Sequence, residues 1–363
     1  MPRDHTFRIA VLPGDGIGPE VMDATLTILK ALQRLDGRLH LDFESFPGGA
    51  GHYRETGVAL DEDTLHAADR ADAILFGAMG LPDVRAADGT EIVPQIDLRT
   101  RFDLYAGVRP CRRLKGTPSP LADARAANID FVIVRESTEG LFASRGRGTV
   151  EDDEVARDTM VITRRTSERL FDFAFHLAEQ RKERGRPGRV TCVDKANVFA
   201  SMAFFRRIFD ERASRFPHLQ ADHCYVDAMA LELVRRPWTF DVLVMENMFG
   251  DILSDLAAAL VGGMGYAPSA DIGDQHALFQ PAHGTAPDIS GTGKANPTAM
   301  ILSAVLMLDW LGRRYGNAAC TEGAARLERA VEEAFAARDL RTCEYGGDDG
   351  TAAVTKAVLD TLR

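Results

Sequence analysis

The sequence predicts an α/β fold with a mainly parallel sheet, and two observations lead to this prediction. Short apolar runs that lack clean alternation and end in turn or charged residues are typical of strands buried on both faces. Segments with helical periodicity separate these runs, and strands that alternate with helices form mainly parallel sheets. The apolar runs are Phe7–Leu12, Ala73–Phe76, Phe131–Val134, Val190–Val193 and Val242–Met245.

The helical pattern is clearest in two long segments, Glu20–Leu35 and Ser167–Lys182. Two shorter segments are apolar over most of their surface: Ala228–Val234, and Leu253–Val261, which ends at a pair of glycines. Helices of this kind are either deeply buried or form a subunit interface. The pattern alone leaves both possibilities open.

Composition narrows the class of protein. A chain of 363 residues allows two domains or one large α/β domain. A net charge of −11 without any basic block excludes broad binding of nucleic acid or of anionic membranes. No apolar run reaches the ~20 residues that span a bilayer, and Met1–Arg8 does not resemble a signal peptide. The five scattered cysteines are expected to be buried free thiols, which places the chain in a reducing cytoplasm.

A glycine-rich loop, Leu12–Glu20, follows the first strand and opens the first helix. Its spacing is GxGxG, which differs from the GxGxxG of dinucleotide-binding Rossmann folds, and it lacks the GK[ST] of a phosphate loop. Glycines allow the backbone to approach another group closely. A tight turn between strand and helix explains the loop equally well.

Two carboxylates, Asp251 and Asp255, follow the strand that ends at Met245. Because they are four residues apart, they share one helical face, where like charges repel unless a cation lies between them. Hard divalent cations such as Mg²⁺ or Mn²⁺ prefer oxygen ligands. Asp227 is a possible third ligand. The alternative is an acidic first turn stabilised by the helix dipole, but the apolar neighbours of these carboxylates disfavour a solvated face.

Arg99, Arg109 and Arg135 are candidate ligands for a di- or tricarboxylic acid, because arginine binds carboxylates in a bidentate manner. They are expected near helix or strand ends, and a surface salt bridge is the alternative for each one singly. Lys195 follows the strand Val190–Val193 and is a candidate base. A solvated lysine is the alternative there.

A second loop, Pro281–Pro297, is rich in glycine, proline and small polar residues. Loops of this kind often carry function on a rigid scaffold. His283 could stack on a purine, and Asp288 could accept hydrogen bonds from ribose hydroxyls. The segment could equally be only a structured connection.

Together, these segments closely resemble the β-decarboxylating dehydrogenase family, which includes isopropylmalate, isocitrate, homoisocitrate and tartrate or D-malate dehydrogenases. The resemblance covers nearly the whole chain in order, and its most specific motifs are Glu246–Asp255 and His283–Asp288. The other matching segments are Leu12–Glu20, Leu98–Arg99, Asp103–Pro110, Val134–Glu136, Asp194–Val198, Tyr225–Asp227 and Asn296–Pro297.

The resemblance implies a fold of two α/β domains that is not a Rossmann fold, with the site in the cleft between them. Residues 1–104 and 262–363 would form the first domain, on the cofactor side. Residues 105–261 would form the second, which carries the dimer contact and the metal. The resemblance further implies a homodimer with shared active sites.

The resemblance also implies an activity: NAD and a divalent metal would support oxidation of a malate-type hydroxy acid, followed by loss of its β-carboxylate. Arg99, Arg109 and Arg135 would hold the substrate carboxylates. Asp251 and Asp255 would hold Mg²⁺ or Mn²⁺, while Lys195 and Asp227 would come from the partner subunit. The positions that would bind NAD are Ile17, His283, Gly284, Ala286, Asp288 and Asn296.

Two departures from the family pattern concern catalysis and substrate. Family members usually have a tyrosine, which helps to protonate the enol carbon, where this chain has Phe142; phenylalanine keeps the ring and loses the acid. Leucine-pathway members typically carry asparagine at Ala228. Phe142 leaves open a catalytically weakened regulatory subunit that binds ligands without turnover.

The third substituent of the substrate should meet the segment before Arg99, formed by Ile92, Val93, Gln95 and Ile96. Isocitrate enzymes usually have serine and asparagine where this chain has Val93 and Gln95, which argues against a γ-carboxylate and for an apolar or small group. The first candidate is 3-isopropylmalate. Tartrate, D-malate and a homoisocitrate-type substrate are the alternatives, since Thr138–Gly140 departs from the leucine-pathway pattern.

Overall fold

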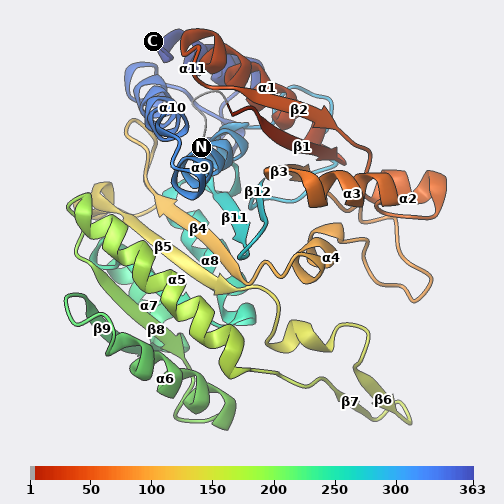
Figure 1. Cartoon of the computed structure of the whole chain (residues 1–363), viewed down its shortest axis with the longest axis vertical. Coiled ribbons are helices and arrows are strands. Elements are labelled where there is room, and N and C mark those ends of the chain that lie inside the picture. Colours follow the sequence, from red (N-terminus) through yellow and green to blue (C-terminus); the bar gives the residue numbers. More distant parts are fainter. Residues whose placement is uncertain (1–4) are drawn as a thin grey trace.

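A ten-stranded sheet runs through the computed structural model, which describes residues 5–363 (Figure 1). Its strand order is β2-β1-β3-β12-β11-β4-β5-β10-β8-β9. The strands are β1 (Phe7–Gly14), β2 (Leu41–Ser45), β3 (Ala73–Ala78), β4 (Ala106–Arg112), β5 (Asp130–Glu136), β8 (Arg189–Asp194), β9 (Gln220–Tyr225), β10 (Val242–Met245), β11 (Pro268–Ile272) and β12 (Ala277–Pro281).

The pairings in the outer parts of this sheet are parallel, so the predicted α/β fold with a mainly parallel sheet is confirmed. Each apolar run that was expected to be a strand lies within one of the observed strands. The sequence did not indicate the antiparallel centre, where β11 opposes both β12 and β4, and β4 opposes β5. These central pairings bring β11 next to β4.

Two groups of helices lie at opposite ends of the molecule. Figure 1 shows α1, α9, α10 and α11 around the chain termini, and α5, α6 and α7 at the opposite end. None of the helices in residues 5–363 is long and apolar enough to cross a membrane. The helices are α1 (Gly18–Leu35), α2 (Ala50–Thr56), α3 (Glu62–Arg70), α4 (Pro94–Arg101), α5 (Arg164–Glu183), α6 (Ala200–Ala213), α7 (Val226–Arg235), α8 (Asn247–Val261), α9 (Thr298–Tyr315), α10 (Ala318–Ala337) and α11 (Thr351–Thr361).

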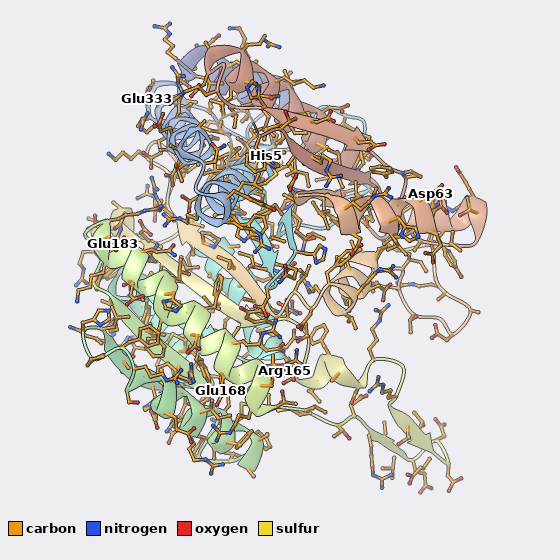
Figure 2. All side chains as sticks on the ribbon, viewed as in Figure 1. His5, Asp63, Arg165, Glu168, Glu183 and Glu333 are labelled. Carbon is orange, nitrogen blue, oxygen red and sulfur yellow. The ribbon has the colours of Figure 1, made fainter. Side chains whose placement is uncertain are left out.

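The two apolar helices, α7 and α8, are only partly buried. Met229 and Leu253 lie in the core, but Leu231 is 54% exposed and Ile252 is 62% exposed. A hairpin of β6 (Thr149–Glu151) and β7 (Val155–Arg157) is exposed along its length. Figure 2 shows its side chains projecting away from the rest of the chain.

Three expectations need comment. All five cysteines are free, and Cys111, Cys192 and Cys320 are buried, but Cys343 is exposed, so the expectation that every thiol is buried was wrong. The expectation about a signal peptide rests partly on residues 1–4, which lie outside the described residues. The domain boundaries at residues 104 and 262 stay a prediction, because the sheet passes through both parts.

The glycine loop approaches the chain's own backbone. Gly14 and Gly16 have φ of 79° and 57°, and a Cβ at Gly16 would lie 2.1 Å from the carbonyl oxygen of Thr285. Between them, the buried carboxylate of Asp15 accepts hydrogen bonds from the amides of Ala50 at 2.7 Å, Gly51 at 2.8 Å and Gly80 at 2.9 Å. Asp15 therefore ties β1 to α2 and to the segment after β3.

Replacing Asp15 by alanine should lower the free energy of unfolding by about 3 kcal/mol, because three amides lose their acceptor inside the protein. Urea denaturation monitored by circular dichroism measures this change. Asp23→Ala, on the exposed side of α1, is the control and should have little effect. Equal stability of the Asp15→Ala and Asp23→Ala variants would show that the three bonds do not support the loop.

Candidate active site

A cavity of about 240 Å³ collects most of the residues that the sequence indicates for substrate and metal. α4, β4, β5 and α8 each contribute charged side chains, and the loop after β12 closes one side. Predicted residues that line the cavity are Gln95, Ile96, Arg99, Arg109, Arg135, Phe142, Asp251, Asp255, His283 and Gly284. Lining residues that the sequence did not single out include Phe76–Met79, Ser254, Ser269 and Gln280.

Other predicted residues lie outside the lining. Val93 precedes the first turn of α4 and does not line the cavity, and Ile17 is buried within the glycine loop. Asn296 is used within the protein: its carbonyl oxygen accepts from Thr298, and its amide nitrogen lies 3.3 Å from a carboxylate oxygen of Glu344. The remaining residues outside the lining are Ala286, Asp288, Lys195 and Asp227.

Arg99 is buried, and its guanidinium has the most unused donors of the three cavity arginines. Its Nε lies 3.1 Å from Oδ2 of Asp271, in poor alignment for a hydrogen bond. Within residues 5–363, neither of its two terminal nitrogens makes a hydrogen bond. A planar guanidinium with both ends free suits bidentate binding of a ligand carboxylate.

Arg109 lies in the middle of β4, so the expectation of a position near a strand end was wrong. Its Nη1 donates to the carbonyl oxygens of Val108 at 3.3 Å and Ala270 at 3.2 Å, and its Nη2 lies 3.4 Å from Oδ1 of Asp271. Burial lowers the pKa of Arg109 from its ordinary value. The side chain is held rigidly at the wall of the cavity.

Arg135 is the next-to-last residue of β5, and side chains of α8 hold its guanidinium. Its Nε and Nη2 donate to Oδ1 of Asn247 at 3.0 and 2.7 Å, and its Nη1 pairs with Asp251. Burial lowers the pKa of Arg135 to about 10. The guanidinium also lies over the ring of Phe142, 5.1 Å from its centroid.

Asp271 is the charged residue that sequence reasoning missed. It is fully buried in β11, and besides Arg99 and Arg109 its carboxylate accepts from Nε2 of Gln280 at 2.8 Å. Burial alone would raise the pKa of Asp271, but Arg99, Arg109 and Arg135 outweigh burial and lower it. A lone aspartate in a short strand carries no motif, so only the three-dimensional structure reveals it.

The carboxylates of Asp251 and Asp255 lie on successive turns of α8 and face the same cavity. Arg135 supplies the positive charge beside Asp251 that the spacing called for. Partial burial, and then the negative charge of Asp251, raise the pKa of Asp255. Two hard oxygen donors in electrostatic conflict fit a divalent cation. Within residues 5–363 they lack the further ligand that would complete a set of three.

Lys195 and Asp227 form a second cluster, outside the cavity. The two side chains pair with each other, and this bond lowers the pKa of Asp227. Asp194 is fully buried, receives two 2.7 Å hydrogen bonds from Arg206 and accepts from the amide of Ala196 at 2.8 Å, which fixes the turn at Lys195. The sequence predicted Lys195 as a base and Asp227 as a metal ligand. In this chain neither residue lines the cavity.

Phe142 is carried by a short 3-10 helix, η2 (Leu141–Ser144), that follows β5. Glu136 holds the preceding turn by accepting from the amides of Thr138 at 2.6 Å and Glu139 at 2.7 Å, and burial raises the pKa of Glu136 to about 7. Glu139 in turn accepts from Thr163 at the start of α5. Glu139, which lies in the Thr138–Gly140 segment that departs from the leucine-pathway pattern, thus has a structural role.

His283 faces the cavity from the loop after β12. Its Nδ1 lies 2.8 Å from the carbonyl oxygen of Gly284 and donates to it, which leaves Nε2 as an acceptor. Nε2 is buried without a partner in the described chain, and burial lowers the pKa of His283. A Cβ at Gly284 would meet nothing within 4 Å. This open, polar corner fits a ligand that carries an N–H or O–H donor.

The fold and the cavity with its arginines and carboxylates agree with the β-decarboxylating dehydrogenase class, and comparisons with known proteins point to the same class. The family described as isocitrate/isopropylmalate dehydrogenase matches residues 8–362. The chain belongs to this family and is a decarboxylating dehydrogenase.

Two dehydrogenases are similar to this chain in sequence over nearly their whole length. The chain is 43% identical to the 3-isopropylmalate/3-methylmalate dehydrogenase of Methanocaldococcus jannaschii, over 98% of this chain and 99% of the relative. It is 44% identical to the 3-isopropylmalate dehydrogenase of Clavibacter sepedonicus, over 100% and 99%.

Solved structures extend the similarity to the fold. The isocitrate dehydrogenase of Methylococcus capsulatus superimposes with a TM-score of 0.85 at 34% identity, covering 99% of this chain and 100% of that one. A β-decarboxylating dehydrogenase of Thermococcus kodakarensis, in its apo form, gives 0.78 at 38% identity, covering 98% and 96%.

Arg99→Lys should weaken binding of succinate, a dicarboxylate that cannot be oxidised at a hydroxyl, by about tenfold, because lysine loses the planar fork. Titration calorimetry measures the dissociation constant. Arg101→Lys, exposed on the same helix, is the matched control and should bind like the original protein. Unchanged affinity in the Arg99→Lys variant would remove Arg99 from the binding site.

Proposed function

We propose that this chain catalyses the NAD- and divalent-metal-dependent oxidative decarboxylation of a 3-substituted malate, with 3-isopropylmalate as the first candidate. The observation that carries the proposal is the cavity in which three buried arginines face two carboxylates. The names of the two relatives favour 3-isopropylmalate. The apolar side chains of Ile96 and Phe142 in the cavity suit its isopropyl group.

The arginines bind and orient the substrate in this proposal. Arg99 offers its free terminal nitrogens to one carboxylate, while Arg109 and Arg135, fixed by their own partners, set the charge around the second. When bound, a divalent cation held by Asp251 and Asp255 would polarise the substrate hydroxyl, and NAD would accept the hydride. Lys195 takes the hydroxyl proton, and the β-carboxylate then leaves as CO₂.

The site is proposed to be shared in a homodimer, in which Lys195 and Asp227 reach the cavity of a second copy. Neither residue lines its own cavity, and the turn that begins at Lys195 exposes the apolar side chains of Val198 and Phe199. Leu231 of α7 and Ile252 of α8 offer further apolar surface to a second copy. The proposed second domain, residues 105–261, would carry this contact.

NAD is proposed to lie along the second loop and the glycine loop, which already contact each other through Ile17 and Thr285. His283 offers an unpartnered buried nitrogen, and the exposed carboxylate of Asp288 is free to accept from ribose hydroxyls. Ala286, with φ of 36°, shapes the turn between them. Asn296 would contribute its position at the start of α9.

A second candidate substrate is tartrate, and one observation favours it. Gln95 lines the cavity, and its Oε1 is buried with no hydrogen-bond partner in the described chain. An unpaired buried acceptor is costly, and a hydroxyl as third substituent would satisfy it. D-malate and a homoisocitrate-type acid are weaker alternatives. The intact Lys195, Asp227, Asp251 and Asp255 speak against a regulatory subunit that lacks turnover.

An assay of NAD reduction with 3-isopropylmalate, tartrate, D-malate, isocitrate and homoisocitrate, with and without Mn²⁺, tests the proposed function. We expect Mn²⁺-dependent turnover with the highest kcat/KM for 3-isopropylmalate. A higher kcat/KM for tartrate would select the second candidate. Absence of turnover with every acid, in protein that still binds them, would select the regulatory subunit.

The cofactor preference should follow from Asp288. Its carboxylate would repel the 2′-phosphate of NADP, so kcat/KM should favour NAD by at least about tenfold. Steady-state kinetics with both cofactors measures the ratio, and Asp288→Asn should reduce it. An equal or higher kcat/KM with NADP would contradict this assignment.

Removing one carboxylate of the proposed metal site should abolish most activity without unfolding the protein. Asp251→Asn is expected to lower kcat by about 100-fold or more and to weaken Mn²⁺ binding, because one hard ligand is lost. Glu333→Gln, on the surface of α10 (Figure 2), is the control and should behave normally. Full activity in excess chelator would rule out a metal role.

Restoring a phenol with Phe142→Tyr should raise kcat with little change in KM, since a general acid typically contributes ~10²–10⁴-fold to a rate. The reason is that protonation after CO₂ release is expected to limit turnover when the acid is missing. Burst and steady-state kinetics separate the late step from hydride transfer. Phe43→Tyr, in β2, is the control. An unchanged or lower kcat for Phe142→Tyr would mean that another group performs the protonation.

A further inference from the structure

Asp271 is the acidic partner of two cavity arginines, yet it is not among the residues that line the cavity. It is fully buried in β11, whose antiparallel pairing with β4 brings its carboxylate to Arg99 and Arg109. Gln280 donates to its Oδ2 at 2.8 Å, and Oγ of Ser137 lies 3.5 Å from its Oδ1. Its carboxylate is therefore a fixed negative charge behind the arginines.

The three arginines of the cavity have different partners. Asp271 contacts Nε of Arg99 and Nη2 of Arg109, and it leaves the two terminal nitrogens of Arg99 to a ligand. Arg135 instead relies on Asn247 and Asp251. Asp271 thus positions two of the three binding groups before any ligand arrives, which spares a ligand the cost of arranging them.

The net charge of the cavity follows from these residues. Three arginines and Asp271 carry a net charge of 2+, and a divalent cation between Asp251 and Asp255 would cancel those two carboxylates. Lys195 and Asp227 of a second copy would cancel each other. A net charge of 2+ matches two substrate carboxylates, whereas a third carboxylate would enter the cavity without a counter-charge.

We propose that Asp271 is a positioning and specificity-determining residue that sets the cavity to accept dicarboxylates and to disfavour tricarboxylates. This proposal rests on the proposed function, because it concerns the substrate of the same site. It predicts that a 3-substituted malate with an uncharged third substituent is preferred over an isocitrate-type acid. The preference comes from a residue that never touches the substrate.

Binding of two unreactive acids to the full chain tests this proposal. Succinate is the dicarboxylate probe and tricarballylate the tricarboxylate probe, and calorimetry in saturating Mn²⁺ gives both dissociation constants. The original protein should bind succinate more tightly. Asp271→Asn, which removes the charge and keeps the shape, should shift the affinity ratio toward tricarballylate by about tenfold, the order expected for one unit charge nearby.

A matched control separates charge from packing. Asp241→Asn also removes a fully buried carboxylate that pairs with an arginine, Arg181 at 2.6 Å, and neither of these two residues lines the cavity. Its affinity ratio should equal that of the original protein even if its thermal stability falls. If Asp271→Asn does not fold, Asp271→Ser, which keeps a small polar group beside Gln280, takes its place.

An unchanged ratio in a folded Asp271 variant, or an equal loss of affinity for both probes, would overturn the proposal and leave Asp271 a purely structural role. Tighter binding of tricarballylate than succinate by the original protein would also overturn it. Because these measurements need no turnover, they remain decisive if the protein oxidises none of the malates. In that case the proposed function would fail while the role of Asp271 could still stand.

Discussion

Three guanidinium groups are buried side by side in this protein, and the arrangement of the surrounding elements satisfies them. A buried charge without a partner costs several kcal/mol, so Arg99, Arg109 and Arg135 each require acceptors. Those acceptors come from β11 and α8, which follow the arginines by more than a hundred residues in the chain. The antiparallel pairing of β11 with β4, at the centre of the sheet, brings Asp271 to Arg99 and Arg109. The same arrangement leaves donors of Arg99 free to bind a ligand.

Much of the fold could be predicted because parallel strands buried on both faces leave an unmistakable apolar run, as in Val242–Met245. The central strands β4 and β11 could not be placed in this way, since Arg109 and Asp271 interrupt their apolar pattern. Pairing direction depends on contacts between segments far apart in the chain, and a single sequence does not contain them. The exposed hairpin β6–β7 also has no apolar face that would predict it.

The site was predictable where residues act as a local motif and unpredictable where they act through tertiary contacts. The spacing of Asp251 and Asp255 places both on one helical face, and the cavity contains both. Asp271 has no such spacing. Val93 differs: the family resemblance assigns it to the third substituent together with Gln95 and Ile96, but only Gln95 and Ile96 of these three line the cavity.

The account depends most on one claim, that the arginine-lined cavity becomes a complete active site only when a second copy supplies Lys195 and Asp227. Mixing two inactive variants, Lys195→Met and Asp251→Asn, tests it directly, because a mixed dimer would contain one site with neither substitution. After dissociation and random reassociation, the mixture should recover about a quarter of the original activity. No recovery from subunits that demonstrably exchange would contradict the claim, and each chain would then have to complete its own site.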